Sequence, residues 1–166
     1  MSKRGAATPA LVVLTRAGVE FVAHDFEHVA GERNFGLAAA DALGVEPARV
    51  FKTLVATVDG GPAGAVVGIV PVDRQLALKA LAVAVGVKRA ELAAPDVAER
   101  FTGYVIGGIS PFGQKRRLPT VLDVSAASFP TIFVSGGRRG LDVELAPGAL
   151  VDVLGAVLAP IAAAAR

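Results

Sequence analysis

The residue whose type and position most suggest chemistry is Lys52, a lysine inside an apolar, strand-like segment. Because side chains alternate between the two faces of a strand, Lys52 shares a row with the apolar residues Leu54 and Ala56. An unpaired ammonium is costly to bury. Lys52 therefore either reaches solvent at a sheet edge or projects into a pocket that receives an anionic or carbonyl group. Thr53 lies on the opposite face and would join such a site only if the strand twists or ends nearby.

A second candidate is the glycine pair Gly107 and Gly108, which precedes Ile109, Ser110 and Pro111. Adjacent glycines let the backbone approach a ligand closely, and they can point successive N–H groups at one oxygen atom. The same pattern also suits a tight turn that only needs glycine at positive φ. The sequence by itself leaves both interpretations open.

Basic side chains are concentrated in one quarter of the chain. Between residues 100 and 141 there are six of them and a single acid, Asp123, whereas the whole chain has 17 basic and 15 acidic residues. Local positive charge favours a phosphate-bearing partner such as a nucleic acid, and it is equally typical of a solvated loop. The six are Arg100, Lys115, Arg116, Arg117, Arg138 and Arg139.

Several kinds of site are excluded by the residue types present. The chain has no cysteine, which excludes disulfides, zinc–thiolate sites and a protein thiol nucleophile. His24 and His28 are four residues apart in a segment typical of a strand and a loop, where such residues lie ~13 Å from each other, too far to share one metal ion. We interpret them as structural histidines, and we expect neither a metal nor a cofactor.

Hydrophobic periodicity, together with the positions of Gly and Pro, predicts the elements that must position these residues. A turn is expected at residues 59–62, between two strands of a hairpin. The predicted helices are Pro9–Ala17 (capped by Thr8), Asn34–Leu43, Leu76–Val85, Pro95–Arg100 and a C-terminal helix from Pro147 that carries residues up to Ile161 on one face; the predicted strands are Val19–Phe26, Val50–Val58, Ala65–Val70, Thr120–Val124, Thr131–Ser135 and Leu141–Leu145.

This mixture of elements predicts a single compact α/β domain over residues 1–166, built on a mixed and largely antiparallel sheet with flanking helices. With 166 residues, 53% of them hydrophobic, the chain can bury roughly 70% of the surface that it exposes when unfolded. The composition is the opposite of that of disordered chains, which are poor in apolar residues.

No segment has the length of a membrane span. The uncharged run at residues 153–165 contains Pro160 and is shorter than the ~20 apolar residues that a span requires. Near the N-terminus, Arg16 interrupts the apolar stretch 11–14, so the segment does not match a secretory signal peptide. We therefore expect a soluble, cytoplasmic protein with no membrane partner.

Taken together and in order, the motifs resemble those of the YbaK/EbsC family of free-standing aminoacyl-tRNA editing proteins, in particular its YbaK-type Cys-tRNA(Pro) deacylases. The resemblance covers almost the whole chain, and the order and spacing of the motifs make it specific. The matching segments are Thr8–Ala10, Asn34–Gly36, Val50–Leu54, Thr102–Tyr104, Gly107–Pro111, Gly113–Thr120 and Ser135–Asp142.

The resemblance implies the barrel-like, mixed α/β fold of prolyl-tRNA synthetase editing domains, and it assigns roles to particular residues. Lys52 matches the essential lysine of the family, and Gly107 and Gly108 would orient the ester carbonyl. At Phe26 the family usually has tyrosine, so a hydroxyl contact is lost and the substrate choice is open. The remaining substrate-binding positions are Thr53, Ile109, Ser110, Pro111, Ser135 and Asp142, and the basic residues expected to contact tRNA are Lys115, Arg116, Arg117, Arg138 and Arg139.

The resemblance also implies a mechanism that requires no protein nucleophile. In YbaK-type editing the cysteinyl thiol of the substrate attacks its own ester carbonyl and releases the tRNA as a thiolactone forms; Lys52 would increase the thiolate fraction or stabilise negative charge. The expected partner is the acceptor end of a mischarged tRNA, with prolyl-tRNA synthetase as a transient partner. Two alternatives are a sister enzyme that uses water to remove alanine from tRNA(Pro) and a non-catalytic module that binds tRNA or a synthetase.

Overall fold

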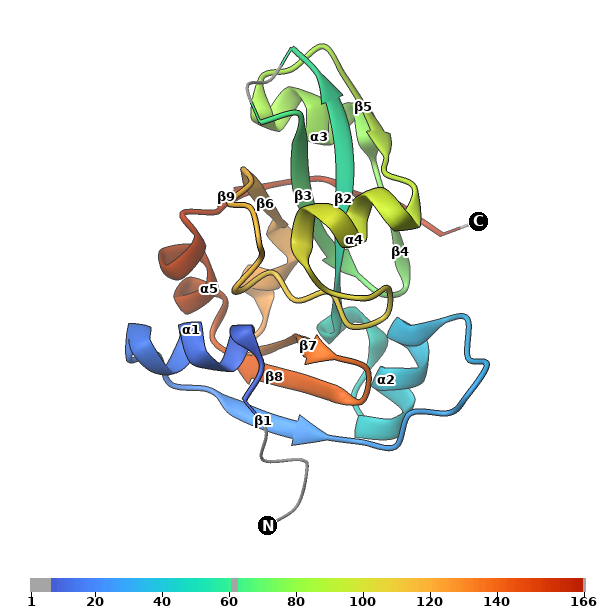
Figure 1. Ribbon diagram of the computed structural model, residues 1–166, viewed down its shortest axis with the longest axis vertical. Coiled ribbons are helices and arrows are strands. Elements are labelled where there is room, and N and C mark those ends of the chain that lie inside the picture. Colours follow the sequence, from blue (N-terminus) through green and yellow to red (C-terminus); the bar gives the residue numbers. More distant parts are fainter. Residues whose placement is uncertain (1–6, 61–62, 166) are drawn as a thin grey trace.

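The computed structural model describes residues 7–60 and 63–165, which form three β-sheets surrounded by short helices (Figure 1). Gly61 and Pro62, in the turn expected at residues 59–62, lie outside the described residues. The helices are α1 (Pro9–Ala17), α2 (Phe35–Leu43), the 3₁₀ turn η2 (Pro47–Arg49), α3 (Leu78–Val85), α4 (Pro95–Thr102), the 3₁₀ turn η3 (Val124–Ser128) and α5 (Pro147–Leu154). The strands are β1 (Val22–Asp25), β2 (Phe51–Asp59), β3 (Ala65–Pro71), β4 (Arg74–Leu76), β5 (Arg89–Leu92), β6 (Thr120–Asp123), β7 (Ile132–Arg138), β8 (Leu141–Leu145), β9 (Val157–Ala159) and β10 (Ala162–Ala164).

The largest sheet has the strand order β5-β2-β3-β6-β9, and the other two are β1-β8-β7 and β10-β4. Within the described ranges, the β3–β6 and β6–β9 pairings are parallel and the other five are antiparallel. The mixed, largely antiparallel α/β fold predicted from the sequence is therefore confirmed. The barrel-like closure is not found, because the strands are divided among separate sheets with free edges.

Strand β2 runs through the centre of the molecule, and its two faces contact different cores (Figure 1). On one face, Phe51 and Val55 belong to a buried cluster that includes Leu14 of α1 and Leu150 of α5. On the other face, Ala56 packs in a cluster with residues of α3. The alternation expected for residues 50–56 is therefore present, and it fixes Lys52 and Thr53 on opposite faces of one strand.

The C-terminal segment differs from the prediction, because the helix that begins at Pro147 ends at Leu154 instead of continuing to Ile161. Gly155 adopts a left-handed conformation (φ 63°) and its N–H donates to the Val151 carbonyl, which closes the helix. The chain then forms β9 beside β6 and β10 beside β4. The apolar spacing that resembled a helical face instead reflects two short strands on either side of Pro160.

Other differences concern short edge elements. Strands β4 and β5 were not predicted, because each has at most one buried residue and therefore lacks a clear apolar alternation. Strand β1 is limited to four residues, although residues 19–26 were expected to be extended. In the part of the chain that the structure describes, no helix is long and apolar enough to cross a membrane.

Candidate active site

A cavity of about 600 Å³ opens where the five-stranded sheet meets the β1-β8-β7 sheet and α2. Its wall is formed by the segment that follows β1, by α2, by the start of β2, by the loop after α4 and by the facing ends of β7 and β8. Among the predicted site residues, those that line it are Phe26, Lys52, Thr53, Gly107, Ile109, Ser135, Arg139 and Asp142. Segments that are far apart in the sequence thus share one concave surface, the usual geometry of a small-molecule site.

Lys52 and Thr53 both reach the cavity even though they lie on opposite faces of β2, because this part of the strand is at a free edge. Strand β5 pairs with residues 56–59 of β2, and the Ala93 N–H after β5 donates to the Val55 carbonyl. Among the described residues, the segment 51–54 therefore pairs with β3 on one side and with no strand on the other. From the sequence, Thr53 was expected to contribute only if the strand twists or ends nearby. In the structure it is the neighbouring strand that ends.

The Lys52 side chain is partly buried in this wall. Burial lowers the pKa of its ammonium from the usual value, and the negative charge of Asp73 partly offsets that effect. Within residues 7–60 and 63–165 no carboxylate lies within ion-pairing distance of Lys52. The ammonium is therefore available to an anionic or oxyanionic group in the cavity.

Thr53 and Asp142 add polar groups that the protein itself leaves without partners. The Thr53 hydroxyl is buried and has no hydrogen-bond partner among the described residues. Asp142 is only 6% exposed, and in the same part of the chain no side-chain hydrogen bond or ion pair involves its carboxylate. Burial raises the pKa of Asp142 to about 7, and the neighbouring His24 opposes that rise. Buried polar groups normally have partners, so both positions indicate a ligand.

Ser135 and Asp142 face each other across the β7–β8 pair, and both line the cavity. The register of the pair shifts between Ser135 and Arg138, where Gly136 and Gly137 form a bulge. The Ser135 hydroxyl accepts a hydrogen bond from the Gly137 N–H at 3.2 Å, which orients the side chain at the edge of the bulge.

The glycine loop provides one cavity-lining glycine and not two. Gly107 has φ 87°, and a β-carbon there would lie 2.7 Å from the Phe35 ring, so only glycine fits between the loop and α2. The Gly108 N–H donates to the Val105 carbonyl at 2.9 Å, and Gly108 is not part of the cavity wall. The expectation that Gly108 donates to a substrate carbonyl is therefore not supported by this conformation.

Ser110 and Pro111, predicted to bind substrate, also lie outside the wall of the cavity. Ser110 is fully buried, and its hydroxyl accepts a hydrogen bond from the Phe112 N–H. Its carbonyl accepts another from the Gln114 side chain. These contacts hold the loop in shape, and Ile109 is the residue of this motif that reaches the cavity.

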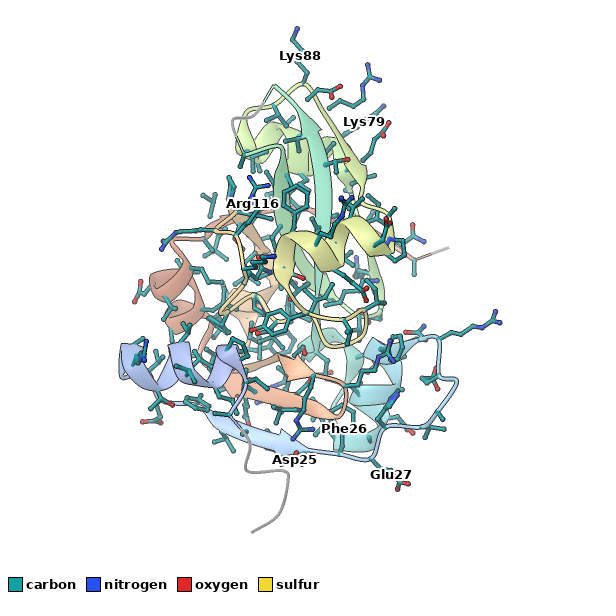
Figure 2. All side chains as sticks on the ribbon, in the orientation of Figure 1. Asp25, Phe26, Glu27, Lys79, Lys88 and Arg116 are labelled. Carbon is teal, nitrogen blue, oxygen red and sulfur yellow. The ribbon has the colours of Figure 1, made fainter. Side chains whose placement is uncertain are left out.

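The basic residues separate into two groups. Arg139 lines the cavity; its Nε donates to the Ile106 carbonyl at 2.8 Å and its guanidinium lies over the Phe35 ring. Arg138 is paired with Asp25 at 2.6 Å. The Arg116 guanidinium lies over the Phe101 ring. Lys115, Arg116 and Arg117 are all outside the cavity wall. Figure 2 shows Arg116 well separated from the cavity residue Phe26.

Phe35 and His28 line the cavity, although neither was predicted to bind substrate: His28 was interpreted as a structural histidine. The His28 and Phe35 rings lie 5.8 Å apart, and Phe35 also contacts Arg139 and covers Gly107. An aromatic residue at the start of a predicted helix looks like an ordinary core residue, so only the folded structure identifies Phe35 as part of the wall. No group of three or more His, Cys, Asp or Glu side chains among the described residues is arranged to hold a metal ion.

Comparison with known proteins gives this cavity a family context. The sequence model of the aminoacyl-tRNA editing domain matches residues 36–153, which include β2, the glycine loop and the β7–β8 pair. A protein of Enterococcus faecalis named "Putative Cys-tRNA(Pro)/Cys-tRNA(Cys) deacylase EbsC" is 42% identical over 116 residues, 70% of each chain. The uncharacterized protein YwhH of Bacillus subtilis is 32% identical over 116 residues, 69% of this chain and 71% of its own.

Solved structures with the same fold cover nearly the whole chain. One, described as "a putative trans-editing enzyme for prolyl tRNA synthetase", superposes with a TM-score of 0.79 and 25% identity, covering 96% of this chain and 99% of its own. Another, the hypothetical protein APE2540, has a TM-score of 0.84 at 24% identity and covers 94% of this chain and all of its own.

Proposed function

Because the chain belongs to the aminoacyl-tRNA editing domain family, we propose that it is a trans-editing deacylase that removes cysteine from mischarged Cys-tRNA(Pro). The name of the E. faecalis relative supports this substrate. The observation that carries the proposal is the presence of two side chains of opposite charge in one cavity. The Lys52 ammonium and the Asp142 carboxylate both face it, and neither has an ionic partner among the described residues.

These two charges match the two ends of an aminoacyl ester. The α-amino group of the substrate is an ammonium and pairs with the Asp142 carboxylate, while the unpartnered hydroxyl of Thr53 supplies a further polar contact. The ester carbonyl lies toward Lys52, where an ammonium stabilises the negative charge that develops on the carbonyl oxygen. A substrate held by both ends needs little further organisation to react with its own side chain.

The reaction then uses the thiol of the substrate. The thiol loses its proton, the sulfur attacks the carbonyl carbon, and a carbon–sulfur bond forms as the carbon–oxygen bond to the terminal ribose breaks. The ribose oxygen takes up a proton, and the products are free tRNA and a strained thiolactone, which water opens to cysteine. A thiol with an ordinary pKa near 8.5 is a few per cent ionised at neutral pH, and a nearby ammonium increases that fraction.

The test compares deacylation of Cys-tRNA(Pro), Ala-tRNA(Pro) and Pro-tRNA(Pro) by the wild-type protein and by Lys52→Met. We expect loss of cysteine alone, and about a 100-fold or greater loss of rate in Lys52→Met. Lys79→Met and Lys88→Met are matched controls, because both lysines are exposed and lie at the far end of the molecule from Phe26 (Figure 2). Removal of alanine would instead indicate attack by water, and tRNA binding without deacylation would indicate a binding module.

Contact with the tRNA is proposed to involve Arg139 more than Arg138. Arg139 lies at the cavity, and among the described residues its side chain makes one hydrogen bond, through Nε, whereas Arg138 is paired with Asp25. Arg139→Gln is expected to raise the KM for tRNA several-fold and to reduce its salt dependence, with a smaller change in Arg138→Gln. Equal effects of the two substitutions would contradict this assignment. Lys115, Arg116 and Arg117 would contact a more distant part of the acceptor stem.

Selection of tRNA(Pro) is proposed to depend on prolyl-tRNA synthetase, in a transient complex that delivers the acceptor end. The chain carries a net charge of only +2, which gives little general attraction to nucleic acid. Added synthetase should therefore increase the deacylation rate at low enzyme concentration. An unchanged rate would place the selectivity in this chain alone.

A further inference from the structure

His24 neighbours Asp142 in the β1-β8-β7 sheet, although it is not part of the cavity wall. In the antiparallel β1–β8 pair, His24 is the partner of Asp142. Directly opposed residues project from the same face of a sheet, with β-carbons about 5 Å apart. The imidazole therefore lies beside a carboxylate that lines the cavity, and its charge lowers the pKa of that carboxylate.

The imidazole is held in one orientation by a set of side chains on that face. Its Nε2 is 2.9 Å from Glu144 Oε1, and its ring packs against Phe133. Glu144 Oε2 in turn lies 3.1 Å from the Arg49 guanidinium and accepts a hydrogen bond from the Thr131 hydroxyl at 2.6 Å. These contacts lower the pKa of Glu144, with the Thr131 hydrogen bond the largest cause.

The arrangement fixes which nitrogen of His24 donates. A carboxylate only accepts hydrogen bonds, so Nε2 carries the proton that is shared with Glu144. A second proton on the imidazole would reside on Nδ1. A positive charge on His24 acts on both neighbouring carboxylates, Glu144 and Asp142, and Glu144 also has Arg49 as an ionic partner.

We propose that His24 is a positioning residue for Asp142: its imidazole, anchored by Glu144, maintains the negative charge that Asp142 presents to the substrate ammonium. The role of that charge in deacylation rests on the proposed function, whereas the coupling of the two side chains does not. Other charged or titratable side chains line the same cavity as Asp142, and a substitution at His24 leaves their charges in place. They are Glu27, His28, Glu32 and Arg33 in the segment after β1, Asp41 on α2, Lys52 on β2 and Arg139 between β7 and β8.

The first test needs no activity. The Asp142 carboxyl carbon is followed by NMR as a function of pH, with Asp142→Asn used to assign its signal. In His24→Gln, which keeps a donor for Glu144 but cannot become charged, the midpoint is expected to rise by about one pH unit. His24→Arg, with a permanent charge, should return it to the wild-type value or below. An equal rise in both variants, or no change in either, would overturn the proposal.

The second test measures kcat/KM for Cys-tRNA(Pro) in wild type and His24→Gln from about pH 6 to about pH 8.5. A one-unit rise in the Asp142 midpoint predicts that wild type is faster by about ninefold near pH 6 and by less than twofold near pH 8.5. The thiol of the substrate titrates identically in both proteins and cancels from the ratio. A loss that is uniform across pH would assign His24 a purely structural role. If wild type deacylates nothing, the proposed function fails while the NMR result still decides the coupling.

Discussion

Two aspartates in this molecule are buried to nearly the same degree and have opposite surroundings. Asp123, at the end of β6, is 4% exposed, and Asp142, on β8, is 6% exposed. The carboxylate of Asp123 accepts hydrogen bonds from the backbone N–H groups of Ser125, Ile161 and Ala162 at 2.9–3.2 Å. That of Asp142 has no such partner in the described residues and faces the cavity.

The difference separates a structural carboxylate from one that is kept for a ligand. Asp123 connects three segments, because Ser125 lies in the 3₁₀ turn that follows β6, Ile161 precedes β10 and Ala162 is its first residue. At Asp142 no hydrogen bond from the described residues offsets the cost of burial, and its pKa is raised to about 7 even though His24 opposes the rise. Burial alone therefore does not distinguish the two residues; the count of donors around each oxygen does.

The largest expected effect on stability is that of Asp123→Ala, which leaves three buried or partly buried N–H groups without an acceptor. We expect a loss of about 4 kcal/mol in the free energy of unfolding, measured by urea denaturation. Hydrogen exchange at Ile161 and Ala162 should accelerate as the connection to β10 opens. Asp123→Asn retains one acceptor oxygen and should lose about half as much. Native exchange rates at both amides in Asp123→Ala would show that the C-terminal segment is held by its strand pairing alone.

Asp142→Asn should instead increase the free energy of unfolding. Since the folded-state pKa of Asp142 lies above its usual value of 3.8, the folded protein binds the proton more tightly than the unfolded chain does. Wild-type stability should therefore fall as pH rises from about 4 to about 7, and Asp142→Asn should lack this part of the decrease. At pH 8 we expect the variant to be more stable by about 4 kcal/mol and inactive in deacylation.

The pH dependence is the decisive part of that comparison. Thermal unfolding of both proteins near pH 4.5 and near pH 8 separates the effect of ionisation from any change in packing, because the gain should nearly disappear at the acidic value. A variant that is less stable than wild type at both values would mean that the Asp142 carboxylate makes stabilising contacts, like those of Asp123. A stable variant with full activity would remove Asp142 from the site.

How much of the fold could be predicted from the sequence depends on how each element signals its ends. Helices α1 and α2 were predicted well because each has a capping side chain, Thr8 or Asn34, and a glycine that closes it. The C-terminal segment was not, because its alanines and leucines fit a helical face as well as two short strands. The hydrogen bonds of Asp123 and the pairing with β6 and β4 decide between them, and both are long-range contacts that local periodicity does not contain.

The residues of the site were also only partly predictable from the sequence. Lys52 was found from its chemistry, because a charge in an apolar strand is unusual, and the resemblance to a known family supplied Asp142 and Ser135. Sequence alone could not separate Gly107 from Gly108, or Ile109 from Ser110, since their order in a loop does not show which backbone groups form the turn. His24 was interpreted as a structural histidine. Its opposition to Asp142 depends on the β1–β8 register, which joins residues that are 118 positions apart.

The smallest expected effects concern two buried hydroxyls. Like the two aspartates, one lines the cavity and the other does not. The hydroxyls of Thr53 and Ser125 are both buried and have no hydrogen-bond partner in the described part of the chain. Thr53 lines the cavity, whereas Ser125 follows Asp123 in the chain. Removing an unpartnered buried hydroxyl spares the folded protein its desolvation cost, so Thr53→Val and Ser125→Ala should each raise the free energy of unfolding by about 1 kcal/mol.

Activity should then distinguish the two variants that stability does not. Ser125→Ala is expected to deacylate Cys-tRNA(Pro) at the wild-type rate, because its hydroxyl lies outside the cavity wall. In Thr53→Val the substrate loses its contact with the buried Thr53 hydroxyl, and kcat/KM should fall about tenfold. Full activity in Thr53→Val, with the expected gain in stability, would mean that its hydroxyl is a packing defect like that of Ser125. The ligand-directed polar groups of the cavity would then reduce to the two charges, Lys52 and Asp142.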